Sequence, residues 1–153
     1  LHQWALRGNI YSRDVLQVKQ PRIGLVNIGE EECKGNELCL KTYPLLAAEQ
    51  RFVFAGNCEG RDVLSGEFDV VVCDGFTGNV LLKFYESIGP MLIGMVAKVA
   101  GLDAREIARA LSQLDVDEQG GAPLLGVRVV SIISHGKSSA RHGKRDPGRV
   151  TRL

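Results

Sequence analysis

Polar side chains follow apolar runs at several places in the chain, and their types suit the binding of an anion. The clearest case is the segment 69–80, where an apolar run ends in a turn that carries Asp74, Thr77 and Asn79 and then becomes helical. Glycines in this turn let the backbone come close to a ligand. Because the free N–H groups at the start of a helix attract anions, this turn is where chemistry is expected first.

Three units of the chain share the order of an apolar strand followed by a turn rich in Gly and Asn. The predicted strands are Ile23–Ile28, Phe52–Ala55 and Val70–Cys73. Helical spacing of apolar residues follows the first strand over Glu37–Ala48, and follows the third from Gly78 toward Ala100. Short, continuous β-branched runs that alternate with helices indicate parallel strands buried on both faces. The predicted fold class is therefore α/β.

The turns after these strands should meet at one edge of the sheet, because crossover connections between parallel strands are right-handed. Their polar residues are Lys34, Asn36, Asn57, Glu59, Arg61, Asp62, Asp74, Thr77 and Asn79. The alternative is that they are solvated turn formers, a role in which Gly, Asn and Asp are common. Three turns at one edge favour a functional crevice.

Further patterns predict elements that support the core. A helix is expected over Asp103–Leu114 with Asp103 as its N-cap, and a strand over Val127–Ile133. The Gly89–Pro90 pair should divide the long apolar helix into two, and Pro44 should kink the helix in which it lies.

Composition places the chain among ordinary globular proteins. The 153 residues are 44% hydrophobic and 24% charged, with a formal net charge of +1, and they suit one domain. The segment 137–153 has six basic residues and one acidic residue, and it lacks apolar periodicity, so a disordered tail is expected. Since the basic charge is confined to this tail and lacks interleaved aromatic residues, nucleic acid is not an expected partner.

The cysteines and the apolar segments bear on the cellular setting. Cys33, Cys39, Cys58 and Cys73 lack the paired spacing of a zinc site, so a reduced cytosolic protein without a metal is expected. No signal peptide is visible, and no run is expected to approach the roughly 20 apolar residues of a membrane span. The apolar helix over 80–100 should be a core helix, a dimer interface or a membrane-docking face. Leu1 in place of a methionine indicates a fragment or a processed chain.

Three ordered motifs together resemble the bacterial phosphate acyltransferases of phospholipid synthesis, the PlsX-type enzymes. The motifs are Asn27–Glu37 (NIGEEECKGNE), Gly56–Asp62 (GNCEGRD) and Val72–Val80 (VCDGFTGNV). The segments Gly120–Gly126 and Ser134–Gly136 are similar too, so the resemblance covers about residues 10–136.

The resemblance implies a three-layer α/β/α fold related to phosphotransacetylases and isocitrate-type dehydrogenases. It also implies a homodimer associated peripherally with the membrane in the bacterial cytoplasm, and a chain that is the carboxyl-terminal portion of a longer one. The expected division is a partial domain over 1–136 and a tail over 137–153. Three departures stand out, because Arg128-Val129 replaces an expected glycine, the basic tail replaces a closing helix, and Pro44 lies inside an expected helix.

The implied reaction moves a long-chain acyl group from acyl-[acyl-carrier protein] to inorganic phosphate and needs no cofactor. Phosphate itself attacks the thioester, so the protein must supply a phosphate cradle and an oxyanion donor. Lys34 is the expected phosphate-binding or carbonyl-polarising cation, with a solvated lysine as the alternative. Asn79 is the expected oxyanion donor or else a helix cap, and Asp74 either orients these two residues or caps the helix.

The remaining site residues are expected to bind substrate. They are Asn36, Asn57, Arg61, Gly75, Thr77, Gly78 and His135. The alternative for His135 is a structural role, which is more common for a lone histidine. Arg61 either holds phosphate or pairs with Glu59 and Asp62, and a nucleophilic role for Cys58 is disfavoured because no histidine is close to it in sequence. Two rival functions are phosphotransacetylase-like transfer from acyl-coenzyme A and a catalytically silent fragment that acts in dimerisation or membrane docking.

Overall fold

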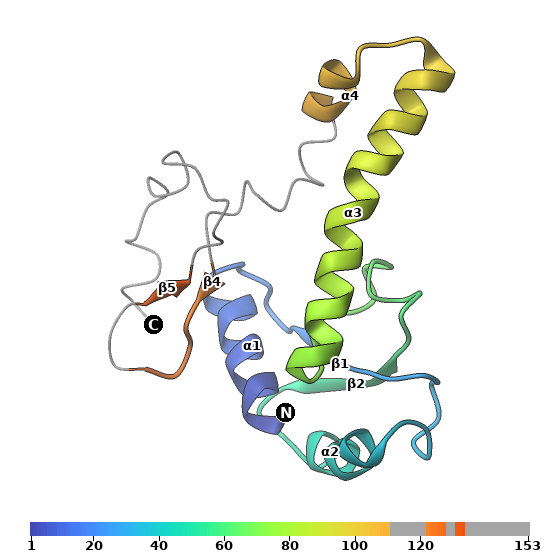
Figure 1. The fold of residues 1–153 in the computed structure, drawn as a ribbon. Coiled ribbons are helices and arrows are strands. Elements are labelled where there is room, and N and C mark those ends of the chain that lie inside the picture. The colour runs from blue at the N-terminus through green and yellow to red at the C-terminus, as the bar shows by residue number, and fades with distance from the viewer. Residues whose placement is uncertain (111–121, 128–130, 134–153) are drawn as a thin grey trace. The chain divides into compact units, whose positions relative to one another are not determined.

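The computed structural model describes residues 1–110, 122–127 and 131–133, and the ribbon in Figure 1 follows them along the chain. The described chain divides into two compact units. The first runs from Leu1 to Asp74, and the second begins at Gly75. Each unit is described by itself.

A small parallel sheet forms the centre of the first unit. Its strands are β1 (Arg22–Val26), β2 (Val53–Cys58) and β3 (Val70–Val72), in the order β2-β1-β3. Both pairings are parallel, as the sequence predicts, and Leu25 of β1 lies opposite Asn57 of β2 and Val72 of β3. The α/β class is therefore confirmed. The second strand is longer than predicted, because it continues through the glycine and asparagine of the expected loop.

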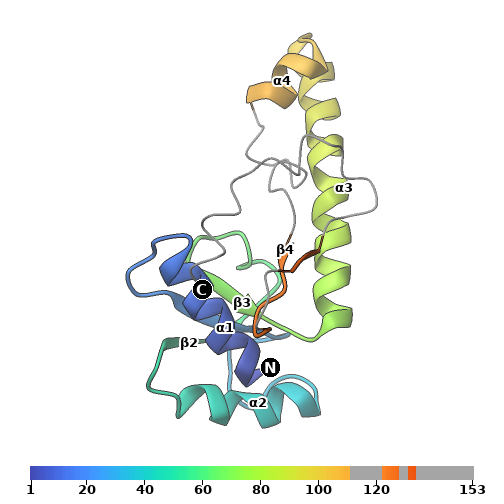
Figure 2. The same ribbon diagram turned by 90° about the vertical axis from the view of Figure 1, so that its left-hand side faces the viewer.

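Two helices cover one face of this sheet. Helix α1 (His2–Asp14) packs against β3, α2 (Glu37–Ala47) packs against β2, and the two helices contact each other (Figure 2). The buried core lies between these helices and the sheet. Its members are Ala5, Ile23, Leu25, Leu46 and Val72.

The other face of β1 is closed by the chain that leads into β3. Gly24 alternates with the core-facing residues of β1, so it faces away from the helices. The ring of Phe68 lies so near that a Cβ atom on Gly24 would come 2.5 Å from it. Glycine is needed here because the aromatic ring occupies the space that any side chain would take.

Helix α1 is an element that the sequence patterns did not predict. Its buried residues are Ala5, Asn9 and Ser12, and only one of these is apolar. Trp4, in contrast, is half exposed, and the guanidinium of Arg7 lies 4.7 Å from the centre of its ring. Because the buried stripe is small and polar, the apolar periodicity that reveals most amphipathic helices is absent.

Helix α2 begins where the sequence predicts and passes through Pro44. Asn36 is its N-cap, and the side-chain oxygen accepts a 2.9 Å hydrogen bond from the Cys39 backbone N–H. Pro44 lies inside the helix with its ring exposed, and its carbonyl still accepts from the Ala48 N–H at 3.1 Å. The helix therefore continues despite the hydrogen bond that a proline removes.

The second unit starts with a long helix that is not divided as expected. Helix α3 (Gly75–Ala100) is continuous across Gly89–Pro90, so the predicted break is wrong. The helix also begins three residues before Gly78. A proline costs one backbone hydrogen bond, and on a helix exposed to water the freed carbonyl can be solvated.

Helix α3 also corrects the expectation about apolar length. With 26 residues and a mean hydropathy of 1.4 over its most apolar window, it is long and apolar enough to cross a membrane. Length and composition alone are weak evidence for a span, because the core helices of globular proteins can share them. None of that window is buried within the structure, and Met95 is 56% exposed.

Beyond α3, the described part of the second unit holds one further helix and two short strands. Helix α4 (Ala104–Ala110) follows Asp103, whose carboxylate accepts from the Arg105 N–H at 2.8 Å, which confirms the predicted N-cap. Strands β4 (Ala122–Pro123) and β5 (Ile132–Ile133) pair antiparallel. Val127 lies in a bend between them and not, as predicted, at the start of a strand. Residues 111–114 of the predicted helix and the expected tail lie outside the described residues.

Candidate functional site

The carboxyl ends of the three strands gather at one edge of the sheet, as the sequence predicts. Asn27 follows β1, Asn57 lies one residue before the end of β2, and Asp74 follows β3 after one further residue. The chain passes from β1 to β2 on one side and returns to β3 on the other. In open parallel sheets, ligands bind outside the carboxyl ends where the strand order reverses in this way. The candidate residues of the first unit therefore lie at a favoured position for a site.

The loop after β1 carries Lys34, the predicted cation. Its backbone N–H donates to the Glu31 carbonyl at 3.1 Å, which closes a turn. The lysine is exposed, and none of the ion pairs found among the described residues includes it. Two neighbouring carboxylates point to other partners, because Glu30 pairs with Arg61 and Glu32 accepts from the Tyr43 hydroxyl. This arrangement leaves an ammonium group for an anion, and the role of Lys34 stays a prediction.

The two predicted asparagines near this loop have structural partners. The side-chain oxygen of Asn36 caps α2, as described above. Asn57 is 6% exposed, and its amide donates to the backbone carbonyls of Glu31 at 2.9 Å and Glu30 at 3.4 Å. The structure thus places Asn57 inside β2 and not in the predicted polar loop. Its observed contacts hold the loop that carries Lys34, and its proposed contact with substrate stays a prediction.

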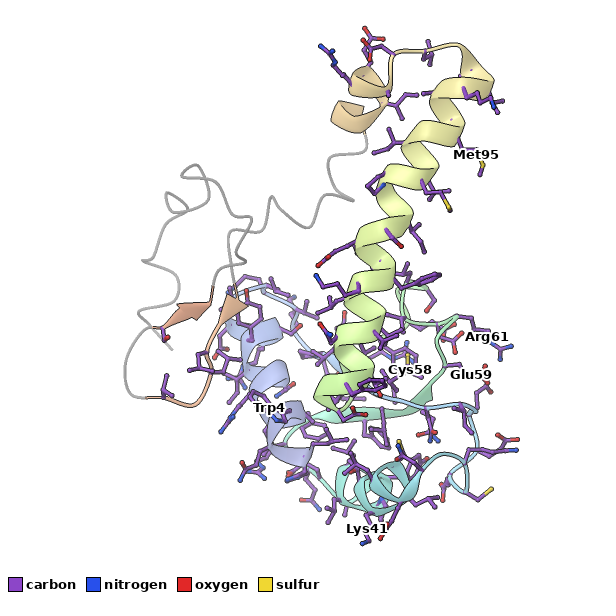
Figure 3. All side chains as sticks on the ribbon, viewed as in Figure 1. Trp4, Lys41, Cys58, Glu59, Arg61 and Met95 are labelled. Carbon is purple, nitrogen blue, oxygen red and sulfur yellow. The ribbon has the colours of Figure 1, made fainter. Side chains whose placement is uncertain are left out.

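Arg61 is surrounded by carboxylates, as Figure 3 shows for Glu59 beside it. The guanidinium lies 3.1 Å from Glu30, 3.4 Å from Glu59 and 3.6 Å from Asp62. The charge of Glu59, the hydrogen bond to Glu30 and the charge of Asp62 raise the pKa of Arg61. A phosphate would have to compete with three carboxylates, so the pairing alternative describes this residue better than phosphate binding.

The cysteines at this edge are poor nucleophiles. Cys58 is fully buried, and burial, followed by the charges of Asp62 and Glu67, raises the pKa of its thiol to about 11. Burial, followed by the charge of Asp74, also raises the pKa of the Cys73 thiol. Since the thiolate is the reactive form, these environments keep both sulfurs inert near neutral pH. They favour the prediction that no cysteine takes part covalently.

The predicted anion cradle lies at the start of α3, in the second unit. Because α3 begins at Gly75, Gly75 and Thr77 fall in its first turn, where N–H groups have no carbonyl partner within the helix. No acidic residue lies in this turn. Asn79 is exposed on the next turn, too far along the helix to cap its start. The cap alternative for Asn79 is therefore wrong, while its role as an oxyanion donor stays a prediction, as does that of Gly78.

Several other expectations concern metals and the end of the chain. No cluster of three or more possible metal ligands occurs among the residues that the structure describes. His135 lies outside those residues, so its expected contact with substrate stays a prediction. Asn27 also lies at this edge, although the sequence patterns gave it no role of its own. An asparagine directly after an apolar strand is the signal that could have identified it.

A hollow of about 220 Å³ lies at the opposite, amino-terminal edge of the same sheet. Its lining residues are Asn9, Arg13, Lys19, Gln20, Pro21, Gln50, Arg51, Phe52 and Val53. Two of its cations are already neutralised, because Arg13 pairs with Asp14 and Arg51 pairs with Glu49. The hollow is therefore a less suitable place for an anion than the edge that carries Lys34.

Comparison with known proteins gives a consistent result. The family model described as fatty acid synthesis protein matches residues 1–145. The phosphate acyltransferase of Parasynechococcus marenigrum (strain WH8102) is 63% identical over 150 residues, which cover 92% of this chain and 35% of that protein. Those of Prochlorococcus marinus (strain MIT 9313) and Synechococcus elongatus (strain ATCC 33912 / PCC 7942 / FACHB-805) are 61% and 55% identical, again over 92% of this chain. The chain spans 34% and 43% of the length of those two relatives.

Proposed function

The chain belongs to the fatty acid synthesis protein family, and from this premise we propose that it takes part in acyl transfer to inorganic phosphate. The acyl donor we propose is a long-chain acyl-[acyl-carrier protein], and the product is acyl-phosphate for phospholipid synthesis. The observation that carries the proposal is the 63% identity to a protein named phosphate acyltransferase. The exposed Lys34 at the edge where the strand order reverses is compatible with the binding of phosphate.

The proposed reaction needs no nucleophile from the protein. A phosphate oxygen attacks the thioester carbonyl, the new C–O bond forms, the C–S bond breaks, and the departing thiolate takes up a proton. Lys34 would bind phosphate or polarise the carbonyl, and the Asn79 amide would donate to the oxyanion. Asp74 would orient these groups. The protonated thiols of Cys58 and Cys73 agree with a mechanism in which no cysteine is acylated.

The setting of this reaction is part of the proposal. We infer a three-layer α/β/α fold related to phosphotransacetylases and isocitrate-type dehydrogenases, and the parallel sheet of three strands supports it. We also infer a homodimer in the cytoplasm that contacts the inner face of the membrane peripherally. The four free cysteines suit a reducing compartment.

Loss of thioester in the presence of orthophosphate tests the reaction and its donor. The full-length enzyme should consume long-chain acyl-[acyl-carrier protein] only when phosphate is present, and it should consume acyl-coenzyme A more slowly. Faster use of acyl-coenzyme A would favour the phosphotransacetylase-like alternative. If neither thioester is consumed, the silent alternative would be favoured.

Two substitutions test the site. Asn79→Ala should lower turnover by about 10²- to 10³-fold, the usual effect of removing one oxyanion donor. Lys34→Ala should raise the KM for phosphate or lower kcat, according to whether the ammonium binds phosphate or polarises the carbonyl. Lys41→Ala is the matched control, because Lys41 is exposed and pairs with Glu37 at 2.6 Å. Parent rates in both site variants would contradict the proposed mechanism.

The exposed apolar surface of α3 supports the dimer or membrane contact. Phe84, Met91 and Met95 are each more than half exposed, and residues 80–100 contain few charges. Replacing Leu92 and Val96 with glutamate should weaken dimerisation or liposome binding, because burying a charge without a partner is costly. Ser87→Glu adds one glutamate at a polar position of the helix, and it should have a smaller effect than either Leu92→Glu or Val96→Glu alone. If the double variant dimerises and binds liposomes as the parent does, the alternative that α3 is an ordinary core helix would be favoured.

A further inference from the structure

The loop over residues 27–36, here called the Lys34 loop, is held by two buried asparagine side chains. We propose that Asn27 and Asn57 are positioning residues that fix the backbone around Lys34 and affect acyl transfer through it. The inference rests on the proposed function, because it takes Lys34 as the group that meets phosphate or the carbonyl.

The side chain of Asn27, directly after β1, bonds backbone groups near both ends of the Lys34 loop. Its side chain is largely buried, its amide donates to the Lys34 carbonyl at 3.0 Å, and its oxygen accepts from the Ile28 N–H at 2.9 Å. Only one orientation of the carboxamide satisfies both bonds. Its own backbone N–H donates to the Cys58 carbonyl at 2.9 Å, which extends the ladder between β1 and β2. Lys34 is thus linked through one side chain to the rigid end of the sheet.

Asn57 holds the middle of the loop. From β2 its amide reaches the carbonyls of Glu30 and Glu31, and the Glu31 carbonyl also accepts from the Lys34 N–H. The two asparagines therefore hold the loop at three carbonyls, on both sides of its turn. Because carbonyl groups accept these bonds, a residue of similar shape without an N–H donor cannot replace either asparagine.

The contacts of Asn27 and Asn57 fix where the backbone of the Lys34 loop lies, and they do not involve a reacting group. The amide nitrogens of both asparagines donate to backbone carbonyls, which is the contact that a positioning residue makes. Lys34 itself is exposed and, among the described residues, makes no ion pair. A long side chain without a partner is placed chiefly by its backbone, and small displacements of a reacting group can cost about 10²-fold in rate.

The test uses the full-length enzyme and a double-mutant cycle. Asn27→Ala and Asn57→Ala should each lower phosphate-dependent kcat/KM by about 10- to 100-fold. In a Lys34→Ala background the same substitutions should cost less than about threefold, because residues that act as a unit are not additive. Hydrogen exchange of the amides in the Lys34 loop should become faster in both asparagine variants.

Asn9 provides a matched control in the same unit. It is also a buried asparagine, 5% exposed, and its amide donates to the Arg51 carbonyl at 3.4 Å near the opposite edge of the sheet. Asn9→Ala should lower stability without changing kcat/KM or the exchange of the Lys34 loop. Equal losses of activity in the Asn9 and Asn27 variants would overturn the proposal, as would a full effect of Asn27→Ala in the absence of Lys34.

Failure of the proposed function can be told apart from failure of the positioning role of the two asparagines. If the parent enzyme consumes no thioester with phosphate, the reaction is wrong, and hydrogen exchange then decides whether the asparagines hold the loop. Unchanged exchange in Asn27→Ala and Asn57→Ala would overturn the positioning role whatever the reaction is.

Discussion

At the scale of single residues, Gly35 shows how closely the Lys34 loop fits the sheet. Its φ angle is +98°, and a Cβ atom at this position would collide with the carboxamide of Asn27. Gly35→Ala should therefore lower the free energy of unfolding by more than the 1–2 kcal/mol, roughly, of left-handed strain alone. Urea denaturation of the full-length protein measures this change.

Gly66→Ala separates the collision from the strain. Gly66 has a φ angle of +81°, but no atom lies within 4 Å of the place where its Cβ would be. This variant should cost only the strain of about 1–2 kcal/mol. Equal costs at positions 35 and 66 would mean that the Asn27 side chain moves aside without loss.

The sequence predicts the position of a residue where that position follows from the order of strands and loops. Asp74 lies at the predicted edge, and Lys34 is exposed in a loop that leaves that edge. Asn36 and Asn57 were expected to face substrate, yet each bonds to nearby backbone. The sequence shows that an asparagine lies in a glycine-rich stretch. Which carbonyl or N–H its side chain bonds depends on the path of the loop, which the sequence does not show.

At the scale of elements, Pro44 offers a test of local helix stability. It lies inside α2 with its side chain exposed, and it leaves the Leu40 carbonyl without the usual helical donor. Pro44→Ala should raise the free energy of unfolding by about 1–3 kcal/mol, as measured by urea denaturation. Lys41→Ala on the same helix should change it by less than about 1 kcal/mol. A loss of stability in Pro44→Ala would mean that packing of Leu46 in the core requires the proline geometry.

Elements with a clear apolar pattern could be predicted, and those without one could not. Strands β1, β2 and β3 and helix α2 appear where continuous or periodic apolar residues occur. Helix α1 was missed because it buries Asn9 and Ser12 where a typical helix buries large apolar residues. The expected break in α3 failed for another reason, since a proline penalty of about 3 kcal/mol is small against a helix of 26 residues.

At the scale of the whole molecule, the edge that carries the candidate residues follows from connectivity. Parallel strands joined by right-handed crossovers bring their carboxyl ends together whatever the side chains are. The strand order β2-β1-β3, with its reversal at β1, could not be read from the sequence, because it depends on which strands form neighbours. The expected three-layer arrangement stays a prediction.

The far edge of the same sheet holds a charge cluster that links α1 to the segment between α2 and β2. Glu49, between α2 and β2, accepts from Arg51 at 2.6 and 2.8 Å and contacts His2 of α1 at 2.8 Å. Hydrogen bonds from Arg51 first, and then from His2, hold the pKa of Glu49 well below its ordinary value of 4.5. The ionised carboxylate therefore stabilises the packing of α1 near the start of β2.

The sign of this shift predicts how the fold responds to acid. A carboxylate with a lowered pKa in the folded state stabilises it fully above about pH 4.5, and this contribution is lost as the pH falls below that value. Glu49→Gln should therefore be less stable than the parent at pH 7, and the difference in free energy of unfolding should shrink as the pH falls below about 4.5. Urea denaturation between pH 7 and about pH 3 measures it. Glu37→Gln, which removes an exposed partner of Lys41, should differ little from the parent at pH 7. A difference for Glu49→Gln that stays constant with pH would show that its charge does not hold α1 in place.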